Sequence, residues 1–110
     1  MDYKRILLVT TVPPENLDAV LEALAEAGAG VVGHYTHCSF SQAGTGRFKP
    51  DAAANPAVGA NEQINAVAEV RIETFLPRES AKAVVTALRA AHPYEEPVIY
   101  LLPLIEEADL

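Results

Sequence analysis

The sequence contains little of what marks several common protein classes. Its 110 residues include one cysteine, no tryptophan, and 8 lysine or arginine against 15 aspartate or glutamate residues. A single cysteine excludes an intramolecular disulfide and suits a reducing compartment. The net charge of -7 argues against non-specific binding to nucleic acid or an anionic membrane. No apolar run approaches the roughly 20 residues of a membrane-spanning helix. We therefore expect a cytoplasmic protein that binds neither nucleic acid nor membrane.

What remains is the composition of one globular domain, with half of the residues hydrophobic. Two similar units follow one another along the chain. In the first, residues 5–12 are apolar on both faces and are stopped by Pro13-Pro14. A helix is expected after these prolines, and Gly28 is placed to end it. A strand is then expected to begin near Val31. The helix is indicated by apolar residues at helical spacing, namely Leu17, Val20, Leu21 and Leu24.

The second unit repeats this layout. Residues 67–73 alternate between apolar and charged, which is typical of a half-buried strand. A second amphipathic helix follows Pro77 and ends at His92-Pro93, and residues 98–102 form the last strand. The order predicts an α+β fold, a ferredoxin-like βαββαβ sandwich in which two helices cover one face of an antiparallel sheet. The first and last strands are apolar on both faces, so we expect self-association to cover the other face.

Between the two units lies a stretch without charge, from residue 27 to residue 46. It holds two histidines and the only cysteine. Residues 34–41 are predicted as a strand, Ala43-Gly44 as a turn, and residues 45–49 as the returning strand. Residues 51–66 show no periodicity and predict a long loop. The chain is thus interpreted as one domain over residues 1–110, with an extended hairpin and loop at about 33–66.

Five sequence blocks occur in order along the chain. They are Gly33-His-Tyr-Thr-His-Cys-Ser-Phe, Gly44-Thr-Gly-Arg-Phe-Lys-Pro, Asn55-Pro56 with Gly59, Glu69-Val-Arg71, and His92-Pro-Tyr-Glu-Glu-Pro. Together they make the chain resemble the YqfO-type domain of the Nif-three-like family, whose members are often labelled GTP cyclohydrolase I type 2 homologues. In longer members this domain is inserted into a metal-binding domain, and the insert is similar to the trimeric CutA and PII proteins.

The resemblance implies a stand-alone insert with a CutA/PII-like fold, a trimer, and a ligand-binding role by analogy with PII. The flanking regions that supply the metal ligands of the longer members are missing from this sequence. The cyclohydrolase activity is therefore not carried over, and a non-enzymatic protein is expected.

A metal site is one interpretation of the uncharged stretch, because His34, His37, Cys38 and His92 are ligands by type. On the predicted strand His37 and Cys38 face opposite ways, and His34 lies roughly 13 Å from Cys38. A divalent ion at His37, Cys38 and His92 would therefore need carboxylates or a neighbouring subunit. The alternative is that these residues are packed and hydrogen-bonded.

An anion site is a second interpretation. Gly44, Thr45 and Gly46 could present backbone N–H groups in a nest, with Arg47 and Lys49 close by. A phosphate, a nucleotide or a carboxylate would suit such a site. The alternative is a plain hairpin turn whose basic residues prevent edge pairing.

The segment from His92 to Pro97 is the third candidate. Its two prolines fix the backbone, so that His92, Tyr94 and the two carboxylates of Glu95 and Glu96 are presented almost rigidly. They could contact a metal ion or a polar ligand, whereas the structural alternative is a helix stop.

These patterns predict a non-enzymatic small-ligand or regulatory binding module that forms a homotrimer. We expect its ligand site between subunits, with a small anionic ligand. The alternatives are a divalent-metal-binding protein of the CutA type, or an assembly domain without a ligand. The expected ligand contacts are Gly44, Thr45, Gly46, Arg47, Lys49, His92, Tyr94 and Glu95, and the metal ligands of the alternative are His37, Cys38 and His92.

Overall fold

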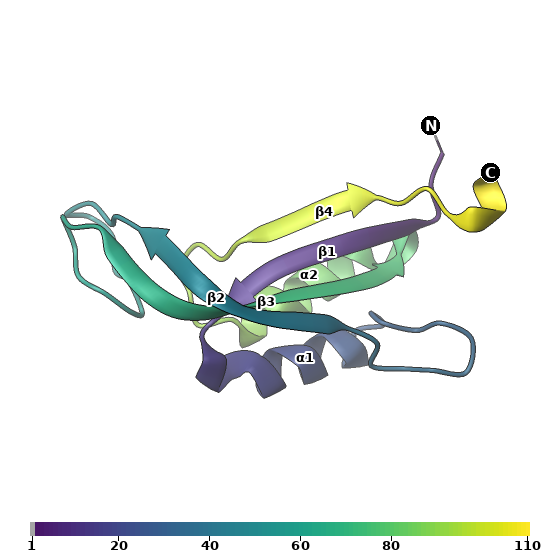
Figure 1. Ribbon diagram of the computed structural model, residues 1–110, viewed down its shortest axis with the longest axis horizontal. Coiled ribbons are helices and arrows are strands. Elements are labelled where there is room, and N and C mark those ends of the chain that lie inside the picture. The colour runs from purple at the N-terminus through teal and green to yellow at the C-terminus, as the bar shows by residue number, and fades with distance from the viewer. Residues whose placement is uncertain (1) are drawn as a thin grey trace.

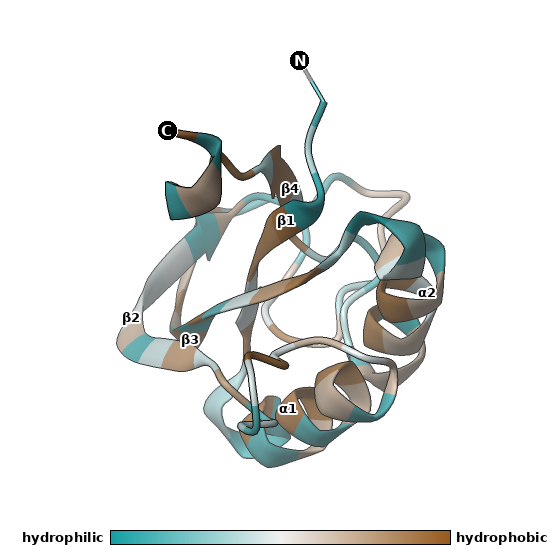
Figure 2. Cartoon of the chain, turned by 90° about the vertical axis from the view of Figure 1, so that its right-hand side faces the viewer, coloured by the Kyte–Doolittle hydropathy of each residue, from teal (hydrophilic) through white to brown (hydrophobic). Residues whose placement is uncertain are grey.

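Four strands form one antiparallel sheet in the order β2-β3-β1-β4 (Figure 1). In this computed structural model, which describes residues 2–110, both helices lie on the same face of the sheet (Figure 2). The predicted ferredoxin-like βαββαβ sandwich is therefore confirmed. Neither helix is long and apolar enough to cross a bilayer. The elements are β1 (Arg5–Val12), α1 (Leu17–Glu26), β2 (Phe40–Phe48), β3 (Asn65–Pro77), α2 (Ala81–Ala91) and β4 (Ile99–Pro103), with short 3-10 helices at Pro14–Asn16, Arg78–Ser80 and Glu107–Asp109.

The core lies between the helices and one face of the two central strands. Alternate residues of β1 and β3 point to this face, as the pleat requires, and each helix contributes its apolar stripe. Burying such side chains is the main stabilising contribution, about 1.5–3 kcal/mol for each. The fully buried side chains include Leu8, Val12, Val20, Ile72, Leu76, Val84 and Leu88.

The other face of the sheet is apolar toward β4 but charged toward β2, where Arg71 and Glu73 of β3 form an ion pair at 2.8 Å. Leu7 of β1 pairs with Phe75 of β3 on one side and with Leu102 of β4 on the other, so these three form a row across the face. The next row places Val9, which is buried, between Glu73 of β3 and Tyr100 of β4. Leu102 is 46% exposed and Tyr100 is 61% exposed. Neither α1 nor α2 covers this face (Figure 2), which we call the open face.

Helix α1 ends as its sequence predicts. Gly28 has a φ of 110°, a value that residues with a Cβ avoid. Its N–H donates to Ala25 O at 3.1 Å, and the N–H of Ala29 donates to Leu24 O at 3.0 Å. These two bonds make a Schellman motif, which turns the chain so that Ala29 enters the core.

The predicted hairpin at Ala43-Gly44 is wrong. β2 runs unbroken from Phe40 to Phe48 and pairs with β3 along its whole length. Gly44 lies in the middle of this edge strand, so it marks no turn there. Gly46 instead allows a close approach, because a Cβ at this position would lie 1.6 Å from Glu69 Oε1. Residues 65–69 of β3 pair only with β2, so the two strands extend beyond β1 (Figure 1).

Residues 31–39 form a loop and not the predicted strand. Val32 and Tyr35 exchange two backbone hydrogen bonds of 3.0 and 2.9 Å across a two-residue turn that begins with Gly33. The φ of Gly33 is 56° and that of His37 is 60°, and neither value belongs to a strand. The predicted separation of His34 from Cys38 assumed a strand. Because these residues lie in a loop, that assumption does not hold.

The predicted loop between β2 and β3 is held by amide and carboxylate side chains. Asp51 Oδ1 accepts the N–H groups of Ala53 and Ala54 at 2.9 and 3.1 Å. Asn61 Nδ2 donates to the carbonyl oxygens of Asp51 and Ala54, and Asn65 Nδ2 donates to Ala60 O at 2.9 Å. Such side chains satisfy backbone groups that have no partner in a sheet. The asparagines thus give this segment one shape without a strand or helix.

Candidate functional site

A cavity of about 260 Å³ lies where the β2–β3 loop and the turn after α2 meet the strands. We call it the Tyr94 cavity. Its lining is partly polar and partly apolar, and we call the two sets of residues its polar and apolar walls. The polar wall carries Arg47, Glu69, Tyr94, Glu95 and Glu96.

The apolar wall comes mainly from the β2–β3 loop, through Pro56, Ala57 and Val58. Phe48 of β2 and Val98, which lies just before β4, also line the cavity. The long loop of the sequence prediction thus forms part of a cavity, which is a common role for loops of this length.

His92 fixes the turn that carries Tyr94. Its side chain is buried, and its Nε2 donates to Thr11 O at 2.7 Å. Its Nδ1 accepts the backbone N–H of Tyr94 at 3.1 Å. A carbonyl only accepts and an amide N–H only donates, so the ring carries its proton on Nε2. The turn is also tied to β1 by Thr10 Oγ1, which donates to Val98 O at 2.6 Å.

The hydroxyl of Tyr94 is the unusual group of the cavity. Among the described residues it is the one buried side-chain oxygen or nitrogen atom without a hydrogen-bond partner. Burial raises the pKa of the Tyr94 phenol most. The carboxylate of Glu69 raises this pKa further, as a hydrogen-bond acceptor for the phenol and through its charge, and Glu15 makes a smaller contribution. The phenol O–H therefore lies beside the Glu69 carboxylate as its natural acceptor, although the contact falls short of normal hydrogen-bond geometry, and the phenol remains a protonated donor at neutral pH.

We expect Tyr94 to stay protonated when the protein is titrated to about pH 11, one unit above the usual tyrosine pKa. The tyrosinate absorbance at 295 nm should then rise equally in the wild type and in Tyr94→Phe. Because the folded pKa is the higher one, this phenol stabilises the fold below pH 10 and loses that effect as pH rises. A smaller rise in Tyr94→Phe would show that Tyr94 ionises with the other tyrosines.

The structure brings only some of the predicted ligand contacts together. Arg47, Tyr94 and Glu95 line the cavity within one chain, although these segments were expected to meet between subunits. Gly44 and Thr45 lie exposed in β2, and Lys49 is exposed at the end of that strand. Among the described glycines, positive φ occurs only at Gly28, Gly30, Gly33 and Gly59, so the predicted backbone nest at Gly44–Gly46 is wrong.

Glu69 was missed as a site residue. The alternation of apolar and charged residues in β3 correctly placed Glu69 on the polar side of a strand. The neighbouring sequence gave no sign that Tyr94 would lie beside it. The glycine at position 46 is the one sequence signal that could have suggested a close approach by a residue of the paired strand.

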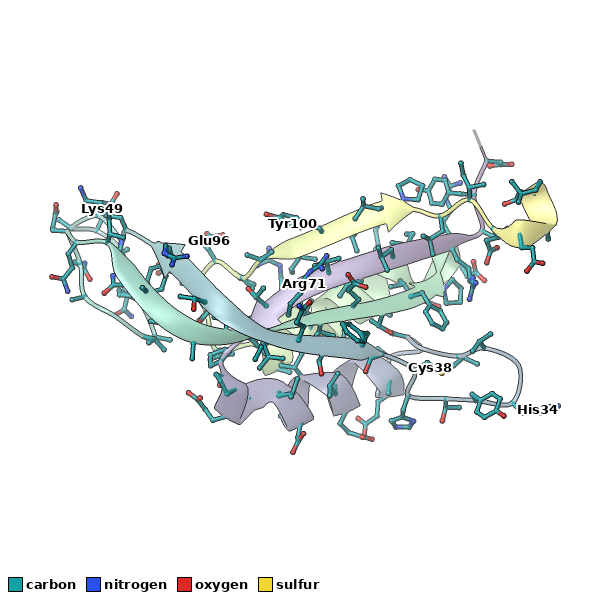
Figure 3. All side chains as sticks on the ribbon, in the orientation of Figure 1. His34, Cys38, Lys49, Arg71, Glu96 and Tyr100 are labelled. Carbon is teal, nitrogen blue, oxygen red and sulfur yellow. The ribbon has the colours of Figure 1, made fainter. Side chains whose placement is uncertain are left out.

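The predicted metal ligands are not brought together. Figure 3 shows His34 at the outer end of its loop, Cys38 at the base of that loop, and Lys49 and Glu96 at the opposite end of the molecule. Both ring nitrogens of His92 are already hydrogen-bonded. His37 Nε2 lies 3.5 Å from Glu22 Oε2. No group of three or more histidine, cysteine or acidic side chains within the described residues is suited to hold a metal ion.

The chain has relatives among known proteins. No protein-family model matches the chain. A curated relative from Mycobacterium tuberculosis, "GTP cyclohydrolase 1 type 2 homolog", is 47% identical over 97 residues, which are 88% of this chain and 26% of the relative. The chain is a homologue of one segment of these proteins. It spans about a quarter of their length, and the predicted resemblance to the YqfO-type segment is confirmed.

Solved structures agree with this assignment. The Bacillus cereus protein related to NIF3 matches with a TM-score of 0.83 and 38% identity, over 94% of this chain and 26% of that protein. CutA1 from Shewanella sp. SIB1 matches with a TM-score of 0.71 and 20% identity, over 96% of this chain and 86% of that one. The second match shows the fold alone, and it confirms the predicted CutA-like fold of the YqfO-type segment.

Proposed function

We propose that this chain is a non-enzymatic small-ligand or regulatory binding module whose ligand occupies the Tyr94 cavity. The observation that supports the proposal is the buried Tyr94 hydroxyl, which lies beside the Glu69 carboxylate but completes no hydrogen bond of normal geometry among the described residues. An unpaired buried hydroxyl costs roughly 1–3 kcal/mol. Such a cost is expected where a ligand supplies the missing partner, and the cavity beside the hydroxyl has a polar and an apolar wall, as small-molecule sites do.

The proposed module is a homotrimer that buries the open face. This part of the proposal rests on the row of Leu7, Phe75 and Leu102 and on the neighbouring Tyr100, of which Leu102 and Tyr100 are exposed. Exposed contiguous apolar surface marks an interaction site on most soluble proteins. A closed ring of identical chains would cover three such faces at once. The likeness to CutA1 concerns the fold, so the argument for the trimer comes from the face itself.

The cavity is tested by a fragment screen that is read out by two-dimensional NMR on the full chain. Fragments should shift the amide signals of the loop and turn around the cavity, including those of Val58 and Glu95. In Tyr94→Phe the same fragments should bind more weakly, because the ligand loses a hydroxyl partner. A screen in which cavity signals never move selectively would overturn the proposed site.

The assembly is tested by native mass spectrometry of the untreated protein. We expect a mass of about 35 kDa, three times the chain mass of 11.8 kDa. A ligand that copurifies would add its own mass to each chain. A species of 11.8 kDa alone at micromolar concentration would refute the trimer and leave the cavity proposal to the fragment screen. Among the described residues no observation favours the alternative function of metal binding.

A further inference from the structure

The charges around the Tyr94 cavity select the kind of ligand. Three carboxylates line it, from Glu69, Glu95 and Glu96, against the single cation of Arg47. No ion pair of Arg47 with any of them is present in the described chain, whose side-chain ion pairs lie elsewhere. The whole chain carries a net charge of -7, which adds a field of the same sign. A phosphate or carboxylate entering this cavity would meet repulsion.

We propose that the Tyr94 cavity binds a small organic cation, a primary ammonium or guanidinium group on a short apolar body. This inference rests on the proposed function of the same cavity. It replaces the small anionic ligand of the sequence prediction, which depended on a backbone nest that the strand at Gly44–Gly46 does not form.

The polar end of such a ligand has matching partners. The oxygen of Tyr94 accepts no hydrogen bond within the described chain, and a phenol oxygen can accept one from a cation. The carboxylate of Glu69 stands beside it and accepts a charge-assisted bond, which is stronger than a neutral one. Gly46 leaves the space that the Glu69 carboxylate occupies. Glu95 already accepts the N–H of Asn55 at 3.3 Å and keeps its second oxygen for the ligand.

The apolar end of the ligand has the apolar lining residues as partners. Pro56, Ala57 and Val58 of the loop face this space together with Phe48 and Val98. A volume of about 260 Å³ lies just below the roughly 300–1,000 Å³ of sites for drug-sized ligands. It therefore suits a short branched or unbranched chain and is too small for a nucleotide.

Three probes of one shape separate the classes: 3-methylbutylamine as the cation, 3-methylbutan-1-ol as the neutral compound and 3-methylbutanoate as the anion. Each is titrated at pH 7 and low salt into the ¹⁵N-labelled full chain, and amide shifts around the cavity give the dissociation constants. We expect the amine to bind at least about tenfold more tightly than the alcohol, and the anion to bind most weakly, because a hydrogen bond to a charged partner exceeds a neutral one by such a factor.

Two variants of opposite sign test the charges. Glu69→Gln should weaken amine binding about tenfold and leave alcohol binding nearly unchanged. Arg47→Gln should tighten amine binding, because it removes the repelling cation. Glu79→Gln is the matched control, since it makes the same charge change at an exposed residue of the helix Arg78–Ser80, which is not among the cavity residues. It should change none of the three affinities.

The outcomes distinguish the two proposals. If the alcohol or the anion binds in the cavity as tightly as the amine, or if Glu69→Gln leaves amine binding unchanged, the cation inference is overturned while the cavity remains a ligand site. If none of the three probes shifts the cavity signals at tens of millimolar (on the order of the weakest binding that such titrations detect), the cation inference falls. If the fragment screen also finds nothing there, the binding function falls with it.

Discussion

Replacing Gly30 by alanine is expected to lower the free energy of unfolding by about 3 kcal/mol. Two costs add at this position. The φ of Gly30 is 78°, a backbone conformation that costs an L-residue roughly 1–2 kcal/mol. A Cβ on Gly30 would also lie 2.6 Å from Cys38 O and 2.8 Å from Cys38 N, and these are backbone atoms that cannot move aside as a flexible side chain would.

Gly30 matters because it joins the loop of residues 31–39 to the sheet. Its N–H donates to Phe75 O at 2.7 Å, and its carbonyl accepts the N–H of Cys38 at 2.9 Å. Thr74 Oγ1 then donates to Cys38 O at 2.8 Å. A displaced Gly30 would therefore break backbone bonds at the edge of the core, and the uncharged loop would lose its attachment to β3.

Two other glycines separate the strain from the clash. Gly33 has a φ of 56°, but a Cβ there meets nothing within 4 Å, so Gly33→Ala should cost only the backbone strain of roughly 1–2 kcal/mol. At Gly44 the φ is not positive and the space is open, so Gly44→Ala should change stability by less than about 0.5 kcal/mol. Urea unfolding followed by circular dichroism measures all three. Equal losses at Gly30 and Gly33 would contradict the backbone clash.

The sequence predicted the elements that carry strong periodicity. The two helices and strands β1 and β3 lie within a few residues of their expected places, because each buries a regular apolar face against the core. Strand β4 also lies near its expected place, although its residues are mostly exposed, because its apolar run stops at Pro103. Gly28 marked the end of α1 for the same kind of local reason, since a Schellman motif needs a residue with positive φ.

The edge strand could not be predicted in the same way. The residues of β2 are almost all exposed, so no alternation of apolar and polar residues defines it. The glycines of this segment predict a turn. In the structure, Gly46 instead leaves room for the side chain of Glu69, which the pairing of β2 with β3 brings close. Similarly, the loop of residues 31–39 owes its shape to Gly30 meeting Cys38 and Phe75, and such contacts between distant residues leave no local pattern.

The candidate site was half predictable. The chemistry of Arg47, Tyr94 and Glu95 suggested ligand contact, and the structure places these residues at one cavity. The assignment of charge was not predictable, because it depends on Glu69 from the neighbouring strand. The role of His92 was open between ligand and helix stop. Its two hydrogen bonds, to Thr11 and Tyr94, make it the residue that positions the turn.

Leu102→Lys is expected to convert the proposed trimer into folded monomers. Leu102 lies on the open face beside Leu7 in the register of β1 with β4, and it is 46% exposed in the single chain. In the monomer a lysine at this position keeps its ammonium group in water. In a trimer that buries the open face, three such groups would lose hydration without a partner, at a cost of several kcal/mol each. We expect the dissociation constant of the assembly to rise at least about 100-fold.

Ile64→Lys is the matched control. Ile64 is 74% exposed but lies in the loop before β3, outside the open face, so the same substitution there should leave the trimer intact. Size-exclusion chromatography with light scattering measures the mass of each variant, and circular dichroism confirms that each remains folded. A trimeric, folded Leu102→Lys would show that the chains associate through another surface. Dissociation of both variants would instead show a general effect of added positive charge. If Leu102→Lys loses the trimer and Ile64→Lys keeps it, the apolar side chains of the open face form the interface.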